Sequence, residues 1–287
     1  GRDLGGGRDH GHQARQVSPA GPSAAPGAGP ATCISTNCLP HLPLEVSLSW
    51  IAAAGFDGIE LVSCPELWLR GPAEVGRMVR RHGLRIFSLH QAALGFCPVG
   101  RDPASLVHDA VETALIAHSA CVVTHFPLWA RPAAELDPWW VNALRAGRER
   151  LRGSGIALTV ENQGTCTTPT DVERVGARLQ QMVEFADREQ LALTLDACHM
   201  GTAGHLLPQT LELFWPRLAH VHVSDFNPPE TVPRGRRFHK ATFEHLMPGD
   251  GALPLGPFLR ELAARGYTGA VSAEVNPLAL RVWSPAG

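Results

Sequence analysis

Eight short apolar runs, each followed by a longer segment of helical periodicity, limit the fold of this chain more than any other feature. The runs have the length and the apolar content of buried strands, and they lie at residues 31–36, 57–62, 84–90, 120–126, 156–161, 191–196, 218–223 and 270–275. Strict alternation of strands and helices predicts a parallel sheet covered by helices. Eight such units close most naturally into a barrel of about 250 residues. The sequence therefore predicts an α/β fold, a single (β/α)8 TIM barrel over residues 31–287.

The rival arrangement is an open, doubly wound sheet. Such a sheet normally carries a glycine-rich phosphate loop after its first strand. Residues 37–40 occupy that place here and read NCLP, so the sequence lacks this loop. Helix signals agree with the alternation: Thr170 or Asp171 is predicted to cap one helix, and another follows Gly256 and stops at Gly266.

Residues 1–30 differ from the rest of the chain in composition. They are rich in Gly, Pro and Ala and contain almost no large apolar side chains. Such a segment buries too little surface to offset the entropy lost on ordering. We therefore predict a flexible tail over residues 1–30.

Charge and cysteine content argue against several classes of partner. The chain has 25 Lys and Arg against 27 Asp and Glu, a formal net charge of -2, so it lacks the basic footprint needed for nucleic acid or an anionic membrane. No apolar run approaches the ~20 residues of a membrane span. The seven cysteines form no Cys-x-x-Cys pair, as is typical of reduced intracellular thiols. We therefore expect a cytoplasmic protein with neither a nucleic-acid nor a membrane partner.

Four acidic or imidazole side chains lie at the carboxyl ends of separate predicted strands. Glu161 ends IALTVE, Asp196 ends LALTLD, His222 lies in LAHVHVSD and Glu274 closes GAVSAEV. An unpaired buried charge costs several kcal/mol, so four such groups at one mouth of a barrel indicate a shared divalent metal ion. Alternation sends His220 and His222 to the same side, and the later residue lies closer to the mouth. We therefore predict His222 as the ligand and His220 as packed deeper.

Five segments together resemble the xylose isomerase-like TIM barrel superfamily. They are VEN at 160–162, LDACH at 195–199, HVHVSD at 220–225, PGDG at 248–251 and GYTGAVSAEV at 266–275. Within this superfamily the chain is most similar to the sugar phosphate isomerase/epimerase group. Three carboxylates and one imidazole suit Mn²⁺, Co²⁺, Zn²⁺ or Mg²⁺ better than copper or an iron–sulfur cluster. The resemblance implies one such cation, held by Glu161, Asp196, His222 and Glu274.

The resemblance also implies a reaction. A cation chelated by a carbonyl and an adjacent hydroxyl of the substrate stabilises an enediolate, and this acidifies the C–H bond between them. In the resembling epimerases the two ligand glutamates exchange that proton, which assigns these roles to Glu161 and Glu274, with His199 donating to the oxyanion. The expected enzyme isomerises or epimerises a small carbohydrate-like substrate: a sugar, a sugar phosphate or a keto-polyol. A dehydratase or lyase using the same enediolate is a close variant.

A second layer of histidines leaves another mechanism open. His90 and His125 end the third and fourth predicted strands, and His245 precedes PGDG. With the first set they resemble the three-zinc site of endonuclease IV-type enzymes, which makes a multi-zinc hydrolase the alternative function. That family has an aspartate two residues before the histidine that matches His245, and this chain has Phe243 there. We therefore interpret His90 and His125 as polar groups that line a sugar pocket.

Further residues are predicted to contact the substrate. Trp68 and Trp129 follow the second and fourth strands in loops, where an indole could stack on a sugar ring or simply cover the rim. Glu60, at the end of the second predicted strand, could accept a substrate hydroxyl or pair with an arginine. The other substrate-binding candidates are His90, His125, His199 and His245.

Three points stay open in the sequence. Ketose epimerases carry an arginine soon after the His-x-His motif, whereas residues 224–229 read SDFNPP, which argues against a ketose 3-epimerase. A barrel with a vestigial site, acting as a binding subunit, is the non-catalytic hypothesis. The resembling proteins are often dimers or tetramers, so a homo-oligomer is also open.

Overall fold

A computed structural model describes residues 29–91, 103–125, 136, 138–164, 169–232 and 242–281. The flexible tail predicted for residues 1–30 lies almost entirely outside these ranges, so it stays a prediction. No helix among the described residues is long and apolar enough to cross a bilayer.

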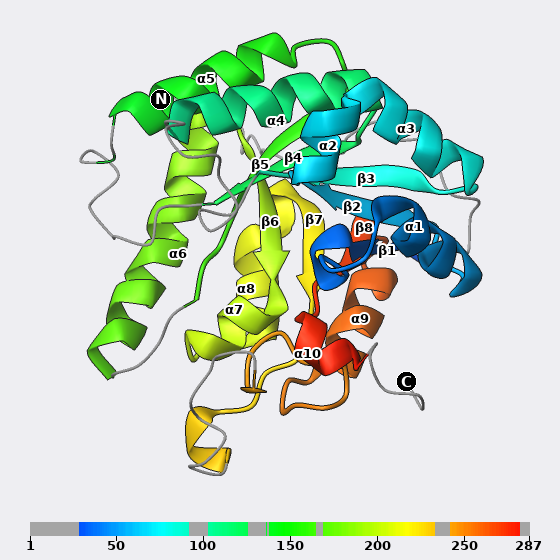
Figure 1. The fold of residues 1–287 in the computed structure, drawn as a ribbon. Helices are drawn as coiled ribbons and strands as arrows, with labels where there is room; N and C mark the ends of the chain where they lie inside the picture. Colours follow the sequence, from blue (N-terminus) through cyan, green and yellow to red (C-terminus); the bar gives the residue numbers. More distant parts are fainter. Residues whose placement is uncertain are drawn as a thin grey trace, which may run out of the picture.

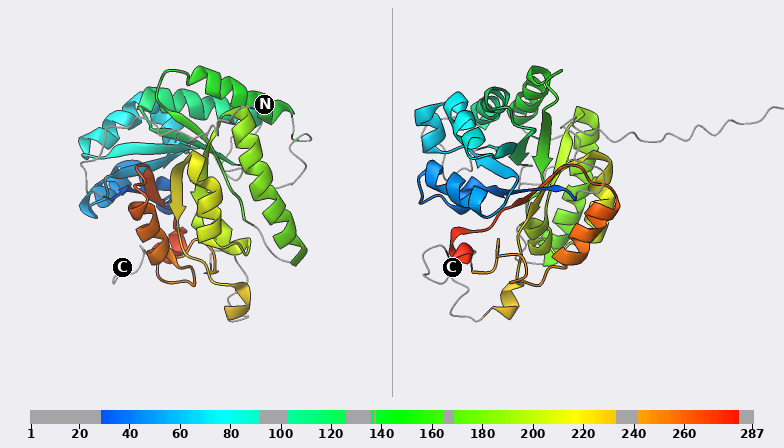
Figure 2. Two further views of the ribbon diagram at one scale, coloured as in Figure 1. Left: turned by 180° about the vertical axis from the view of Figure 1, so that it is seen from behind. Right: turned by 90° about the vertical axis from the view of Figure 1, so that its right-hand side faces the viewer.

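The described residues form a closed barrel of eight parallel strands in sequence order, in which β8 pairs with β1 (Figures 1 and 2). This confirms the (β/α)8 TIM barrel. The strands are β1 (Ala31–Ser35), β2 (Gly58–Val62), β3 (Arg85–His90), β4 (Cys121–His125), β5 (Ala157–Glu161), β6 (Ala192–Asp196), β7 (Leu218–Val223) and β8 (Ala270–Ala273). Each begins and ends within two residues of its predicted bounds. The last strand is shorter than expected, so Glu274 lies directly after β8 rather than within it.

Helices cover the outside of the barrel (Figure 1). They are α1 (Leu44–Ala53), α2 (Pro65–Arg70), α3 (Pro72–Arg81), α4 (Pro103–Ala117), α5 (Pro138–Arg150), α6 (Pro169–Glu189), α7 (Ala197–Thr202), α8 (Leu207–Phe214), α9 (Leu255–Ala264) and α10 (Pro277–Leu280), with 3₁₀ turns η1 (Thr36–Cys38), η4 (Trp215–Arg217) and η5 (Pro229–Thr231). The caps predicted at Thr170 or Asp171 are wrong, because Pro169, whose fixed φ suits a first helical turn, already begins α6. The stop predicted at Gly266 agrees with the structure, where α9 ends just before it and its φ is 73°.

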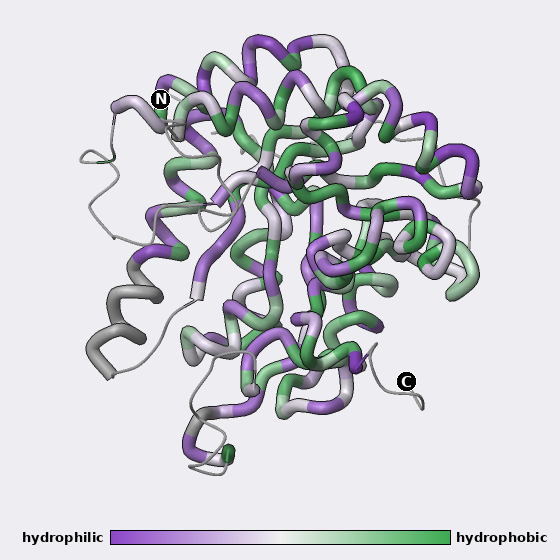
Figure 3. Tube along the Cα trace, viewed as in Figure 1, coloured by the Kyte–Doolittle hydropathy of each residue, from purple (hydrophilic) through white to green (hydrophobic). Residues whose placement is uncertain are grey.

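Helix α3 shows how local sequence produces this outer layer. Pro72 opens the helix, where its missing N–H has no cost, and Val75, Met78 and Val79 bury one face. Arg80 and Arg81 lie in the last turn, where they complement the helix dipole. Figure 3 shows the same mixture of hydrophilic and hydrophobic residues along the outer helices. The apolar core therefore lies between the helices and the barrel.

The inside of the barrel is polar toward the carboxyl ends of the strands. In β7, Val221 and Val223 belong to the apolar core, while His220 and His222 alternate with them and face the interior. Buried polar residues follow the same rule in the other strands: Ser35, Glu60, Ser88, Thr159, Thr194 and Ser272. The interior is thus a column of hydrogen-bonding side chains that leads to the carboxyl ends of the strands.

The first residue of β2, Gly58, has no room for a side chain. A Cβ at Gly58 would overlap the carbonyl oxygen of Arg85 and the ring of Phe87, so only glycine fits there. The register between the two strands then shifts, and Glu60 becomes the partner of Ser88. Glycine and the shift together fix where the Glu60 carboxylate enters the barrel.

Candidate metal centre

The four predicted ligands meet at one mouth of the barrel. Glu161 and Asp196 are the last residues of β5 and β6, His222 is the second-last residue of β7, and Glu274 follows β8. One donor atom from each lies within 4.8 Å of the donor atoms of the others. We name these four residues the strand-end cluster. Three of them are fully buried, and 17% of the Glu274 side chain is exposed.

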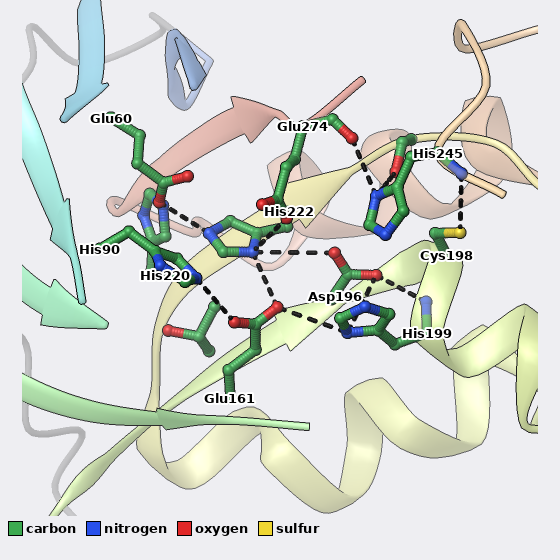
Figure 4. A network of polar contacts seen from close by, with 12 residues as sticks. Glu60, His90, Glu161, Asp196, Cys198, His199, His220, His222, His245 and Glu274 are labelled. Atoms are coloured by element: carbon green, nitrogen blue, oxygen red, sulfur yellow. Dashed lines mark hydrogen bonds and ion pairs between the residues drawn. The ribbon is translucent and has the colours of Figure 1, made fainter. Parts of the chain in front are cut away.

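His222 lies at the centre of the cluster (Figure 4). Its Nδ1 is 3.0 Å from Oε1 of Glu161, 3.1 Å from Oε2 of Glu274 and 3.7 Å from Oδ2 of Asp196. Figure 4 shows the two glutamates reaching this nitrogen from opposite sides. All the donor groups therefore converge on a single point next to Nδ1.

Burial and mutual charge set the protonation of the cluster. Burial alone would lower the pKa of His222, but the carboxylates of Glu60, Glu161 and Glu274 outweigh it and hold this pKa well above 6.5. For Glu161, burial would raise the pKa, yet His222 and other histidines hold it well below 4.5. The same opposition gives Glu274 a pKa of about 2. Burial prevails only at Asp196, whose pKa is raised.

A divalent cation fits this donor set. Oδ2 of Asp196 is buried and makes no hydrogen bond within the described part of the chain, although buried polar atoms normally have a partner. Oδ1 of the same residue accepts from the backbone N–H of His199 at 2.6 Å and caps α7. One oxygen thus positions the carboxylate, and the other faces the point where the cluster converges.

Cation binding is expected to release a proton. The raised pKa of His222 means that its ring is protonated at pH 7 without a cation, and a ligating nitrogen must lose that proton. The apparent affinity for Mn²⁺ should therefore increase as the pH rises toward the pKa of His222, by up to about tenfold per pH unit. Isothermal titration calorimetry in two buffers with different heats of ionisation measures this release. Equal binding heats in both buffers would contradict the expectation.

His199 lies beside the cluster and is oriented by the protein. Its Nδ1 is 2.9 Å from the carbonyl oxygen of Asn162, so Nδ1–H donates there. Burial alone would lower the pKa of His199, but the charges of Asp196 and Glu161 raise it. The ring meets that of His245 edge to face, with centroids 5.2 Å apart. Two imidazoles therefore stand together next to the strand-end cluster.

His245 is held in place by its backbone. Its φ is 51°, in the left-handed region that few non-glycine residues adopt. Its N–H donates to Sγ of Cys198 at 3.2 Å, and its carbonyl accepts from the backbone N–H of Asn276 at 2.8 Å. Nδ1 lies 3.0 Å from the carbonyl oxygen of Glu274. This strained conformation fixes the ring against the residue that completes the cluster.

A second group of donors shares Glu161. His90, His125 and Glu161 also place donor atoms within 4.8 Å of one another. Oε2 of Glu161 is 3.3 Å from Nε2 of each histidine, while its Oε1 faces His222. Burial alone would lower the pKa of His90, but Glu161 and Glu60 raise it to about 9. Glu161 therefore divides its two oxygens between two sets of imidazoles.

Glu60 lies deeper than predicted. It is in the middle of β2 rather than at its end, and it is fully buried. Its Oε2 is 2.8 Å from Nε2 of His222, 3.3 Å from Nε2 of His220 and 2.9 Å from Oγ of Ser88. These histidine contacts take the place of the arginine partner that the sequence suggested. The deeper position predicted for His220 agrees with this contact.

Comparison with known proteins identifies the family. The family model described as xylose isomerase-like TIM barrel matches residues 48–282. The chain belongs to this family. An uncharacterised protein of Mycobacterium tuberculosis (strain ATCC 25618 / H37Rv) is 26% identical over 267 residues, which cover 86% of this chain and 89% of the relative.

Solved structures share the fold of this xylose isomerase-like barrel. A D-tagatose 3-epimerase-like protein matches with a TM-score of 0.63 and 23% identity, covering 86% of this chain and 91% of that one. The IOLI protein, solved with a bound zinc atom, matches with a TM-score of 0.62 and 17% identity, covering 88% and 91%. Structures of this fold also include a 3-keto-D-glucoside 4-epimerase, a sugar phosphate isomerase/epimerase and an AP endonuclease of family 2. Proteins that share this fold therefore include enzymes of several kinds.

The two predicted tryptophans have different outcomes in this xylose isomerase-like barrel. Trp68 lies on α2 rather than in a loop, because Pro65 opens a short helix directly after β2, and it is 42% exposed. Trp129 lies outside the described residues. Contact of either side chain with a substrate stays a prediction.

Sequence reasoning missed two residues that shape the site. The side chain of Asn162 donates to the carbonyl oxygen of Asp196 at 3.1 Å and accepts from its N–H at 2.8 Å, which ties the end of β6 to β5. Asp225 accepts from the backbone N–H groups of Gly249 and Leu253 and so holds the loop after His245. Both belong to the motifs VEN and HVHVSD, but their roles depend on backbone contacts that the sequence does not show.

Proposed function

We propose that this protein is a divalent-cation-dependent isomerase or epimerase of a small sugar, sugar phosphate or keto-polyol. One observation carries the proposal: two glutamates, the buried Glu161 and the partly exposed Glu274, approach the same point beside His222 from opposite sides. A pair of carboxylates arranged in this way can remove a proton from one face of a carbon and return it to the other. The fold supports the proposal, because a 3-keto-D-glucoside 4-epimerase and a D-tagatose 3-epimerase-like protein are among the structures that share it.

Glu161, Asp196, His222 and Glu274 would hold the cation, which is Mn²⁺, Co²⁺, Zn²⁺ or Mg²⁺ on the chemistry of these donors. When bound, the cation supplies Lewis-acid stabilisation of the negative charge that develops on the substrate oxygens. The carboxylates repel one another without it, since each of Glu161 and Glu274 opposes ionisation of Asp196. The donor set is therefore suited to a positive ion.

The two glutamates are proposed to move the proton. Both have pKa values below the ordinary range, so both are ionised at neutral pH, which is the form that a general base requires. Glu161 is fully buried at the end of β5, whereas Glu274 is partly exposed at the mouth. Glu274 is thus the carboxylate that a substrate entering from the mouth meets first.

The neighbouring imidazoles are proposed to orient the substrate. Nδ1 of His199 and Nδ1 of His245 are both occupied by backbone carbonyl oxygens. Each ring therefore has Nε2 left for a substrate oxygen, and a hydrogen bond from His199 would stabilise an oxyanion. The same proton removal followed by loss of a hydroxyl gives the dehydratase or lyase variant.

Solvent hydrogen exchange tests the proposed function. The purified protein, loaded with Mn²⁺, is incubated in D₂O with a panel of ketoses, inososes and their phosphates. We expect deuterium to enter at least one substrate at the carbon next to the carbonyl, as detected by mass spectrometry and proton NMR. A protein that binds Mn²⁺ but exchanges none of the panel would contradict the acid–base proposal. A protein that retains no metal would instead support the non-catalytic hypothesis.

The second donor group favours one other candidate, a multi-zinc hydrolase. His90, His125 and Glu161 could hold another cation, because Glu161 presents a separate oxygen to them. Phe243 stands where the resembling hydrolases place an aspartate, and its carbonyl oxygen accepts from the backbone N–H of Asn227 at 2.9 Å.

Metal stoichiometry separates the two candidates. The isomerase proposal expects one Zn²⁺ or Mn²⁺ per chain by elemental analysis after dialysis, and His90→Asn should leave that count unchanged. If the protein is a multi-zinc hydrolase, we expect about three zinc ions per chain, and His90→Asn should lower the number of bound zinc ions.

A further inference from the structure

We propose that Glu60 is a positioning residue that fixes the ring and the tautomer of His222, so that Nδ1 faces the cation. The inference rests on the proposed function, because it assumes that the strand-end cluster binds a metal ion. It assigns Glu60 a role other than the contact with substrate that the sequence suggested. The buried carboxylate would act through His222 and would touch neither cation nor substrate.

The two nitrogens of His222 face different partners. Nε2 is 2.8 Å from Oε2 of Glu60, and Nδ1 is 3.0 Å from Oε1 of Glu161. Figure 4 shows Glu60 on one side of the ring and the carboxylates of the strand-end cluster on the other. Rotation of the ring would therefore break both short contacts.

The chemistry of a ligating histidine explains why a carboxylate is suited to that place. The nitrogen that binds a cation carries no proton, so the remaining proton must be on the other nitrogen. An acceptor at that nitrogen selects this tautomer, holds the ring plane and makes the ligand more basic. A carboxylate is the strongest such acceptor in a protein. Oε2 of Glu60 is placed to accept a hydrogen bond from the Nε2–H of His222.

Glu60 is itself held in position. Oγ of Ser88 donates to its Oε2 at 2.9 Å, and Nε2 of His220 lies 3.3 Å away. The register shift pairs Glu60 with Ser88 on the neighbouring strand, and Gly58, where a Cβ would overlap the carbonyl oxygen of Arg85, lies two residues before it. Backbone and side-chain contacts thus aim this carboxylate across the barrel at β7.

Imidazoles face the buried carboxylate of Glu60. The residue is fully buried, and its Oε2 lies 2.8 Å from Nε2 of His222 and 3.3 Å from Nε2 of His220, so the contact with His222 is the shorter of the two. A neutral side chain would fill the same space without a buried charge. The retained carboxylate is therefore matched to the imidazole that it contacts.

The test compares Co²⁺ binding by the full chain and by two variants. Glu60→Gln keeps the shape and an acceptor oxygen, whereas Glu60→Met removes every acceptor. We expect the affinity for Co²⁺ to fall about 10- to 100-fold in Glu60→Gln and further in Glu60→Met, because outer partners of a metal ligand have effects of that size. Glu189→Gln is the matched control, because Glu189 is also a buried glutamate but pairs with Arg145 on the outer layer. The affinity of this variant for Co²⁺ should equal that of the wild-type protein.

A spectroscopic signal separates positioning from a general effect on folding. In the Co²⁺ protein, the Nε2–H of His222 should give a paramagnetically shifted proton NMR signal that persists in H₂O, because Glu60 protects it. We expect this signal to be lost in Glu60→Met and kept in Glu189→Gln. If Glu60→Met does not fold, Glu60→Gln decides through its affinity and the shift of the same signal.

Two outcomes would overturn the inference, and they are distinguishable. If the wild-type protein binds Co²⁺ and both Glu60 variants bind it equally well with an unchanged signal, the positioning role is wrong and the proposed function stands. If the wild-type protein binds no divalent cation, the proposed function fails and the role of Glu60 fails with it.

Discussion

Glu274→Gln is expected to slow solvent deuterium exchange into the substrate by about 10²- to 10⁴-fold, the usual contribution of a general acid or base. The pKa of Glu274 is about 2, because His222 outweighs the effect of burial, so this carboxylate is ionised at neutral pH, the form that a general base requires. Glutamine has nearly the same shape and keeps an oxygen that can face the cation, but it cannot carry the proton.

The measurement must separate proton transfer from metal loss, since Glu274 also belongs to the strand-end cluster. Exchange is therefore measured at saturating Mn²⁺, with the metal content of each sample determined in parallel. Glu261→Gln is the control, because Glu261 is an exposed glutamate that pairs with Arg265 on α9. If Glu274→Gln holds its metal and exchanges at the wild-type rate, the acid–base role belongs elsewhere.

The barrel and the strand-end cluster could be predicted because both depend on short-range periodicity. Strand and helix alternation defines parallel strands, and the carboxyl ends of parallel strands meet at one mouth. Glu161, Asp196 and His222 each stand at or next to the end of such a strand, so the sequence alone brings them together. Only the placement of Glu274 differs from the prediction, because the sequence placed it within the eighth strand and the structure places it directly after β8.

The inner layer could not be predicted in the same way. Glu60 and His222 are 162 residues apart and lie on strands that are not neighbours, so their contact depends on the closed barrel and its stagger. Alternation shows that Glu60 faces inward but not at what depth. The same limit applies to Asn162, whose side chain binds the backbone of Asp196 rather than a recognisable partner side chain.

Asp196→Asn is expected to abolish cation binding and to stabilise the cation-free protein. Loss of an anionic ligand should weaken binding by more than the ~10- to 100-fold typical of outer partners. Burial raises the pKa of Asp196, and Glu161 and Glu274 add to this, so ionisation at pH 7 opposes folding. Asparagine removes that charge and keeps the oxygen that caps α7.

The expected gain in stability is about 1 kcal/mol, which corresponds to a rise in Tm of about 2–4 °C for a chain of this size. Differential scanning calorimetry in the presence of EDTA measures this rise. In a second scan with Mn²⁺, the Tm of the wild-type protein should increase and that of Asp196→Asn should not, because a ligand stabilises the state that binds it. Asp187→Asn, at an exposed aspartate paired with Arg217, is the control and should respond to Mn²⁺ as the wild type does. A lower Tm for Asp196→Asn in EDTA would mean that the Asp196 carboxylate stabilises the folded protein, which would contradict the prediction. A higher Tm together with lost Mn²⁺ binding would mean that the carboxylate binds the cation and destabilises the cation-free protein.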